Sequence, residues 1–159
     1  MKIYRGGFTL LEVVIFMSLF TTIFLTITYV NLGSIKNNKL NEHKIMASYY
    51  AETLGEWLRG EKDASWSAFL INSDLDDNNS IDYCFNESTL STWTAGANFF
   101  QGQCSNNFAL NNIFQREAGF NKIIGGGGET QIEADISVRW YEGPELQQIK
   151  LNTILNQYE

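Results

Sequence analysis

The chain has 159 residues, enough for one compact domain and an extension, because domains usually hold about 100 to 150 residues. Hydrophobic residues make up 44% and aromatic residues 14%, which excludes a disordered chain and predicts a folded core. The net charge of -7 argues against broad nucleic-acid binding, since affinity for the phosphate backbone depends mainly on Lys and Arg.

An apolar segment follows a short basic leader. Residues 1–7 contain Lys2 and Arg5, and residues 8–30 are apolar except for Glu12 and a few hydroxyl side chains. As a helix, residues 8–30 would measure about 35 Å, slightly more than the ~30 Å hydrocarbon core of a bilayer. The next basic residue is Lys36. By the positive-inside rule, the leader stays in the cytoplasm and the rest of the chain lies outside the inner membrane.

The small residues that a peptidase could use lie before the apolar segment. No A-x-A-like pattern follows Val30, so we expect the helix to be retained rather than removed as a secretory signal. Cleavage after Gly7 would expose the amine of Phe8, and glycine permits the close backbone approach that a peptidase requires.

Glu12 is costly inside a spanning helix, by about 2.5 to 3.5 kcal/mol on insertion scales. A free amine on Phe8 is cationic near neutral pH, and it could pair with Glu12 of a neighbouring subunit. The alternative is a carboxylate that reaches the lipid headgroups. The first interpretation sets a register between packed helices, whereas the second is only a way to tolerate the charge.

The run Gly-Phe-Thr-Leu-Leu-Glu-Val at residues 7–13, followed by an apolar helix, resembles the processing motif of type IV prepilins. The resemblance covers about the first thirty residues. It implies cleavage after Gly7 by a prepilin peptidase, N-methylation of Phe8 and a docking role for Glu12. Many major pilins carry proline or glycine in the apolar segment; residues 8–30 contain neither, which fits a minor subunit better.

The resemblance implies a minor pilin or pseudopilin, not an enzyme, assembled into a type IV pilus-like or type II secretion-like filament. Its expected partners are other pilin subunits, the prepilin peptidase, inner-membrane assembly machinery and membrane lipid. The protein would be a single-pass inner-membrane protein before assembly, and then part of an extracellular filament or periplasmic pseudopilus. Two alternatives stay open, a filament-borne adhesin or DNA-uptake receptor, and a single-pass membrane protein that does not polymerise.

Beyond the apolar segment the helix is expected to become amphipathic over residues 31–60, followed by a head of residues 61–159. Arg59 and Gly60 form a helix stop signal. Apolar residues recur at spacings of three and four, which indicates a face that packs on the head. They are Met46, Tyr50, Leu54, Trp57 and Leu58.

Strict alternation over residues 130–141 predicts a half-buried strand with Ile132, Ala134, Ile136, Val138 and Trp140 on one face. The turn at residues 142–145 predicts an antiparallel hairpin, and a shorter strand is expected over residues 81–85. Together these elements predict an α+β, pilin-like fold, a long N-terminal helix packed on a small antiparallel sheet. Residues 139–141, Gly143 and residues 151–153 resemble the C-terminal pattern of pilus-modification minor pilins.

Cys84 and Cys104 lie in the part expected to be exported, where oxidising conditions favour a disulfide over two buried thiols. Such a bridge would contribute about 3 kcal/mol in the chain-entropy model. Residues 86–112 are rich in Ser, Thr, Asn and Gly, which predicts an irregular surface loop held by the bridge and the main contact surface of the head.

Oxygen-bearing side chains alternate over residues 74–82, as at the start of a calcium loop. They are Asp74, Asp76, Asn78, Ser80 and Asp82. Asn79 stands where glycine is usual and Phe85 where a bidentate Glu belongs, so a solvated turn is the competing interpretation. No cofactor other than calcium is expected.

No residue pattern indicates catalysis. His43, the single histidine, is expected on the polar part of the helix, facing solvent or another subunit. The glycines at residues 125–128 lack the Lys and Ser/Thr of a phosphate loop, which favours a flexible linker.

Overall fold

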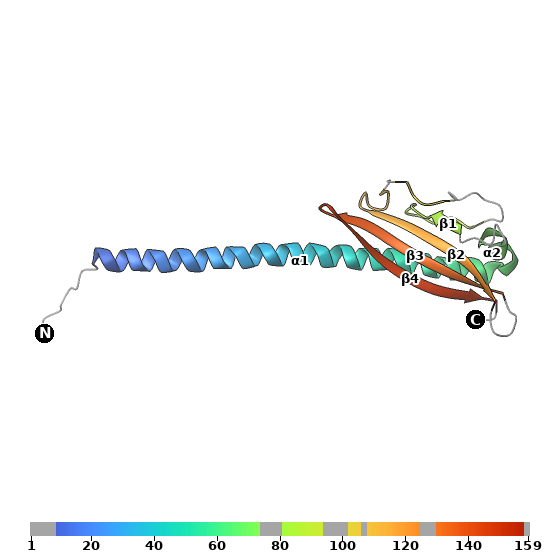
Figure 1. The fold of residues 1–159 in the computed structure, drawn as a ribbon, viewed down its shortest axis with the longest axis horizontal. Coiled ribbons are helices and arrows are strands. Elements are labelled where there is room, and N and C mark those ends of the chain that lie inside the picture. The colour runs from blue at the N-terminus through green and yellow to red at the C-terminus, as the bar shows by residue number, and fades with distance from the viewer. Residues whose placement is uncertain (1–8, 74–80, 94–101, 106–107, 125–129, 158–159) are drawn as a thin grey trace. The chain divides into compact units, whose positions relative to one another are not determined.

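The computed structural model describes residues 9–73, 81–93, 102–105, 108–124 and 130–157. Its elements in chain order are two helices, α1 (Leu10–Ala64) and α2 (Trp66–Ser73), and four strands, β1 (Ile81–Cys84), β2 (Phe114–Ile124), β3 (Thr130–Glu142) and β4 (Glu145–Asn156). The expected α+β fold, a long N-terminal apolar helix and an antiparallel sheet, is confirmed (Figure 1).

The four strands form one antiparallel sheet in the order β1-β2-β3-β4. The predicted hairpin is β3–β4, whose closing pair is Glu142 with Glu145. Gly143 has φ of 62°, which L-residues with a side chain rarely adopt, and Pro144 follows it. A glycine with positive φ at the first central position is typical of a type II′ turn, whose twist matches that of the flanking strands.

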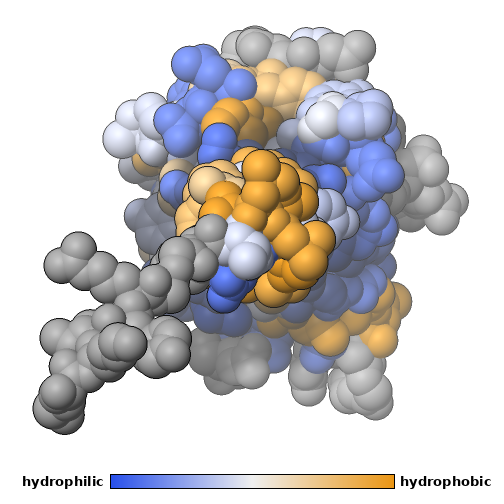
Figure 2. All heavy atoms as spheres, turned by 90° about the vertical axis from the view of Figure 1, so that its left-hand side faces the viewer, coloured by the Kyte–Doolittle hydropathy of each residue, from blue (hydrophilic) through white to orange (hydrophobic). Residues whose placement is uncertain are grey.

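The chain falls into two units, Met1–Glu42 and His43–Glu159. In the first, the described residues are all helical from Leu10 onward, and the large apolar side chains from Leu10 to Ile35 are exposed, from 46% at Val13 to 83% at Leu10. Figure 2 looks at the start of α1 and shows apolar side chains over most of its surface, with a small polar patch among them. This helix is long and apolar enough to cross a membrane.

Five hydroxyl side chains of this apolar helix, from Ser18 to Thr28, are satisfied within it. Each donates to a backbone carbonyl three or four residues earlier, so these hydroxyls need neither water nor a partner chain. Examples are Ser18 to the Ile15 carbonyl at 2.8 Å, Thr26 to that of Thr22 at 2.8 Å and Thr28 to that of Phe24 at 2.9 Å. The polar residues of this segment are thereby compatible with a hydrocarbon environment.

In the second unit, the last part of α1 packs on one face of the sheet. The predicted stripe is confirmed, because Leu54 and Leu58 are fully buried and the other three members pack against the core. Small residues at a spacing of four allow close approach of the helix: Ala47, Ala51 and Gly55 are all buried. A Cβ on Gly55 would lie 3.5 Å from the Leu151 side chain.

The sheet face that covers this helix is the one predicted. Exposure is 1% or less for every residue of the predicted buried face of β3, namely Ile132, Ala134, Ile136, Val138 and Trp140. The strand itself extends one residue further than predicted, to Glu142. The return strand and the short strand near residue 81 are also present, as β4 and β1.

The predicted helix stop at Arg59 and Gly60 is wrong. Helix α1 continues to Ala64, and Gly60 is not among the residues with positive φ, so it does not adopt the left-handed cap conformation that ends many helices. The break comes instead at Ser65, whose hydroxyl accepts a hydrogen bond from the Ala68 N–H at 3.4 Å and caps α2. Helix α2 was not predicted.

An aromatic cluster fills the core next to α2. Trp93 is 3% exposed, and its ring lies 5.3 Å from Tyr83 and 5.4 Å from Phe120, measured between ring centroids. Its indole N–H has no hydrogen-bond partner in the described part of the chain, at a cost of about 1 to 3 kcal/mol. Burial of the ring area and its edge-to-face contacts must outweigh that cost.

Arg116 is the most buried charge of the described residues, at 2% exposure on β2. Its guanidinium donates to three main-chain carbonyls, those of Phe85 at 2.9 Å, Tyr50 at 3.1 Å and Glu87 at 3.1 Å. Burial lowers the pKa of Arg116 to about 10, an effect that Tyr50 partly opposes. The side chain thus joins α1, β2 and the segment after β1 at one point.

Replacing Arg116 should destabilise the second unit strongly, because this one side chain binds three main-chain carbonyls. Arg116→Met leaves three buried carbonyls short of a donor, and we expect the free energy of unfolding to fall by about 3 kcal/mol. Arg116→Lys should lose nearly as much, because an ammonium group cannot span the three carbonyls as a planar fork does. Tryptophan fluorescence of the full chain in detergent micelles during denaturation measures both. The exposed Lys150→Met is the control, and an unchanged midpoint for Arg116→Met would contradict this role.

Candidate functional site

The N-terminal end of α1 carries the residues expected to function in processing and docking. Gly7 and Phe8 lie outside the described residues, and Glu12 lies in the first turn of the helix. Thr9 precedes the helix, and its hydroxyl accepts a hydrogen bond from the Glu12 N–H at 3.3 Å. Thr9 is therefore the N-cap residue of α1.

Glu12 also has a local position that the sequence motif alone did not suggest. Thr9 and Glu12 stand at the N-cap and N3 positions, the spacing of a capping box, and the Glu12 N–H forms the Thr9 half of that box. A carboxylate in the first turn is also stabilised by the helix dipole. Helix capping and intersubunit pairing thus make separate demands on Glu12: the first needs a hydrogen-bonding side chain, and the second needs a negative charge.

The predicted disulfide between Cys84 and Cys104 is confirmed, with the two Cα atoms 4.8 Å apart. The Cys104 N–H donates to Oε1 of Glu117 at 2.7 Å, and the same carboxylate pairs with Arg139 on β3. The bridge therefore lies beside an ion pair on the face of the sheet that is turned away from α1. Glu117, which the chain around Cys104 contacts, is only 8% exposed.

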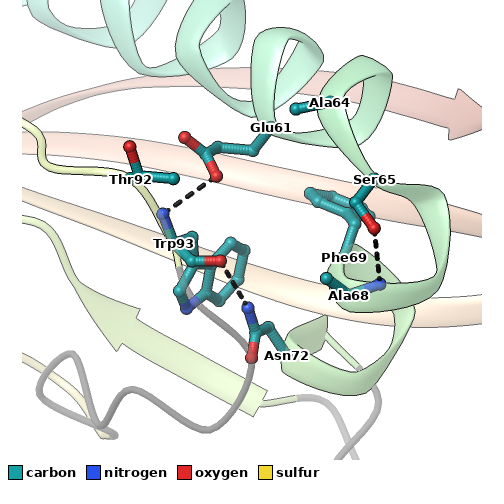
Figure 3. A pocket seen from close by; sticks show the side chains of 8 residues that line it. All are labelled: Glu61, Ala64, Ser65, Ala68, Phe69, Asn72, Thr92 and Trp93. Atoms are coloured by element: carbon teal, nitrogen blue, oxygen red, sulfur yellow. Dashed lines mark hydrogen bonds between the residues drawn. The ribbon is translucent and has the colours of Figure 1, made fainter.

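The segment over residues 86–112 is only partly the surface loop that was predicted. Trp93 and Leu110 are buried, at 3% and 2% exposure, whereas residues 87–89, 91 and 92 are exposed. The backbone at Trp93 is held on both sides, because its N–H donates to Oε2 of Glu61 at 2.9 Å and its carbonyl accepts from Nδ2 of Asn72 at 3.1 Å (Figure 3). The segment is attached to the core at Trp93 as well as at Cys104.

A hollow of about 270 Å³ lies beside this attachment, between the end of α1, helix α2 and the backbone at Trp93 (Figure 3). Its wall is mainly apolar, and two of its polar side chains, Glu61 and Asn72, already bind the Trp93 backbone. Glu61 and Asn72 therefore hold the chain at Trp93 in place beside the hollow. The lining residues are Glu61, Ala64, Ser65, Ala68, Phe69, Asn72, Thr92 and Trp93.

Most of the predicted calcium ligands, Asp74, Asp76, Asn78 and Ser80, lie outside the described residues. Asp82 is described, and its carboxylate accepts a hydrogen bond from Nε2 of Gln103 at 3.1 Å. Within the described ranges no group of three or more His, Cys, Asp and Glu side chains could hold a metal ion. Calcium binding stays a prediction.

His43 does not face solvent as expected. Its Nδ1 lies 2.8 Å from Oε2 of Glu142 at the end of β3, and both side chains are about three-quarters buried. The imidazole also packs edge-on against Phe114. The residue therefore ties α1 to the β3–β4 hairpin. The signal in the sequence was weak, because the two residues are 99 positions apart.

Comparison with family models, with curated proteins and with solved structures gives no match.

Tyr83 offers a test of how tightly the aromatic cluster is closed. Its hydroxyl donates to the Asn72 carbonyl at 2.6 Å, and burial raises the pKa of Tyr83 above its ordinary value of 10.0. The folded state thus keeps a proton that the unfolded state releases above pH 10. The stability from this group is complete below pH 10 and is lost as the pH rises through the folded pKa.

We expect Tyr83→Phe to be less stable than the wild type by about 1 kcal/mol below pH 10, through loss of the hydrogen bond. The difference should shrink as the pH rises above 10, because phenylalanine cannot ionise in the unfolded state. Denaturation of both proteins between pH 8 and pH 11 measures it. The exposed Tyr141→Phe should show no such trend, and a constant difference for Tyr83→Phe would contradict the buried, protonated hydroxyl.

Proposed function

We propose that this protein is a minor pilin or pseudopilin, anchored in a membrane by α1 and then assembled into a filament. The observation that supports this most is the first unit: its helical residues from Leu10 to Ile35 leave their large apolar side chains exposed all round. Exposed apolar area costs about 25 cal/mol per Å² in water, so this surface requires lipid or other helices.

A filament role accounts for more features than a simple anchor does. An anchor needs only the apolar length, whereas side-by-side packing of helices also needs a device that sets their register. Glu12 in the proposed mature protein is the fifth residue after Gly7, close enough to the helix start for the amine of a neighbouring chain's Phe8 to reach it. In a water-poor environment that ion pair would be strong in attraction and costly to break.

The second unit fits a head that presents a surface. In the described part of the chain, three of its charged or titratable side chains, Arg116, Glu117 and His43, are used in structural contacts. The exposed part of the 86–112 segment, held at Trp93 and at the disulfide, is the contact surface in this proposal. A filament-borne adhesin would use the same segment.

Three variants separate docking from helix capping at Glu12. Glu12→Gln keeps a side chain that can serve in a capping box but removes the charge, and we expect it to abolish incorporation into filaments. Thr9→Ala removes the N-cap but keeps the charge, so incorporation should persist at the cost of about 1 kcal/mol of helix stability. Glu12→Ala should fail like Glu12→Gln. Incorporation is measured as the fraction of the chain that sediments with sheared filaments.

Membrane levels of each variant are the control, because a chain that is not inserted cannot be incorporated. Normal incorporation of Glu12→Gln would refute the ion pair. Failure of Thr9→Ala together with success of Glu12→Gln would assign Glu12 to helix capping alone.

A further inference from the structure

Strand β4 has an open edge. It ends the strand order of the sheet, so no described strand pairs with its outer side. Its pairing with β3 is unbroken over twelve residue pairs, from Gln131 with Asn156 to Glu142 with Glu145, without a bulge. Proline is absent from Glu145–Asn156 and Lys150 is its single basic residue. Proteins usually blunt such edges with bulges, prolines or charged side chains; β4 carries charges only at Glu145 and Lys150, so an edge this long and regular is open to addition of a strand that places no cation beside Lys150.

The groups that an added strand would use can be identified. A two-residue turn closes on a hydrogen-bonded pair, here Glu142 with Glu145, and hydrogen-bonded pairs alternate along an antiparallel ladder. The odd-numbered residues of β4 therefore bond to β3, and the even-numbered residues direct their N–H and C=O groups to the open edge. Their side chains at Leu146, Gln148 and Ile154 are exposed.

A cationic pocket lies at the C-terminal end of the same strand. Its cavity of about 390 Å³ is lined by Arg59, Lys62 and Asp63 of α1 and by Thr153, Ile154 and Leu155 of β4. Lys62 pairs with Asp63 at 3.0 Å. Arg59 is exposed, and in the described part of the chain its contact is the neutral hydroxyl of Thr153 at 3.5 Å. Among the residues that the structure describes, Arg59 therefore has no carboxylate partner, and its positive charge lies beside the open edge.

We infer that the outer edge of β4 is a docking site for an extended strand of a different protein, with a carboxylate that pairs with Arg59. The backbone groups of the even-numbered residues supply general affinity, and the charge at Arg59 supplies direction and selectivity, as in other cases of strand addition. This inference does not depend on the filament role of α1.

A second copy of this chain is a poorer occupant. Two β4 strands that pair about a two-fold axis with full overlap bring Lys150, near the middle of the strand, beside its own equivalent. Like charges opposite or diagonal to each other destabilise such a pair. A foreign strand with acidic ends meets Arg59 without placing one Lys150 beside another.

The test uses the full chain in detergent micelles and two synthetic peptides of alternating Thr and Val, one with Glu at both ends and one with Lys at both ends. We expect the acidic peptide to bind at least tenfold more tightly, and Arg59→Glu to reverse that preference. Gln148→Pro removes one outward N–H without touching the ladder to β3, so it should abolish binding of both peptides, whereas Gln148→Thr should bind normally.

Hydrogen exchange keeps the test decisive if Gln148→Pro does not fold. In the wild type, saturating acidic peptide should slow exchange at the even-numbered amides of β4 and leave β1 unchanged. Equal affinity for the two peptides, binding that Arg59→Glu does not alter, or protection elsewhere would each overturn the inference. Self-association of the wild type that Arg59→Glu leaves intact and the peptide does not displace would assign the edge to a second copy instead.

Discussion

The apolar surface of the first unit is the constraint that everything else must accommodate. From Leu10 to Ile35, large side chains that would form the core of a soluble protein are exposed on every side of a helix. The Ser and Thr hydroxyls between Ser18 and Thr28 bond back to the helix, so these polar groups are satisfied without water. Water is the wrong solvent for this surface. A bilayer and a bundle of like helices are both suitable, and a filament subunit must pass from the first to the second.

The second unit shows how a small head retains an irregular segment without a large core. The segment after β1 is attached at three points that differ in chemistry: the aromatic ring of Trp93, the disulfide at Cys104, and the carbonyls of Phe85 and Glu87 on the guanidinium of Arg116. A charge buried without a carboxylate is costly unless its donors are used, and here three carbonyls use them. The exposed residues between Glu87 and Trp93 are held at both ends of that stretch, which suits a surface that meets a partner.

The sequence predicted those elements whose periodicity reports a single buried face. Strand β3 alternates cleanly because one face packs on α1. Strand β2 was missed because residues 114–118 are all buried. The outer face of the strand lies under the disulfide segment, with Glu117 paired to Arg139, so buried and exposed residues do not alternate there.

The helix stop predicted at Gly60 was wrong because a glycine caps a helix in this way only where its backbone turns left-handed, and the packing of the neighbouring residues decides whether it does. Contacts between residues far apart in the chain, such as that of Arg116 with the Tyr50 carbonyl, leave no pattern in the local sequence. The position of Glu12 in a capping box was readable from Thr9 but was obscured by the stronger motif around it.

We propose that the working form of this protein starts at Phe8 and functions in a non-aqueous assembly through the helix that follows it. Intact-mass spectrometry can be applied to the chain purified from membranes and from sheared filaments. We expect a chain that lacks residues 1–7, carries one methyl group on the new N-terminal amine, and is found in both fractions. An unprocessed chain that begins at Met1, stays in the membrane and never enters the filament fraction would contradict it.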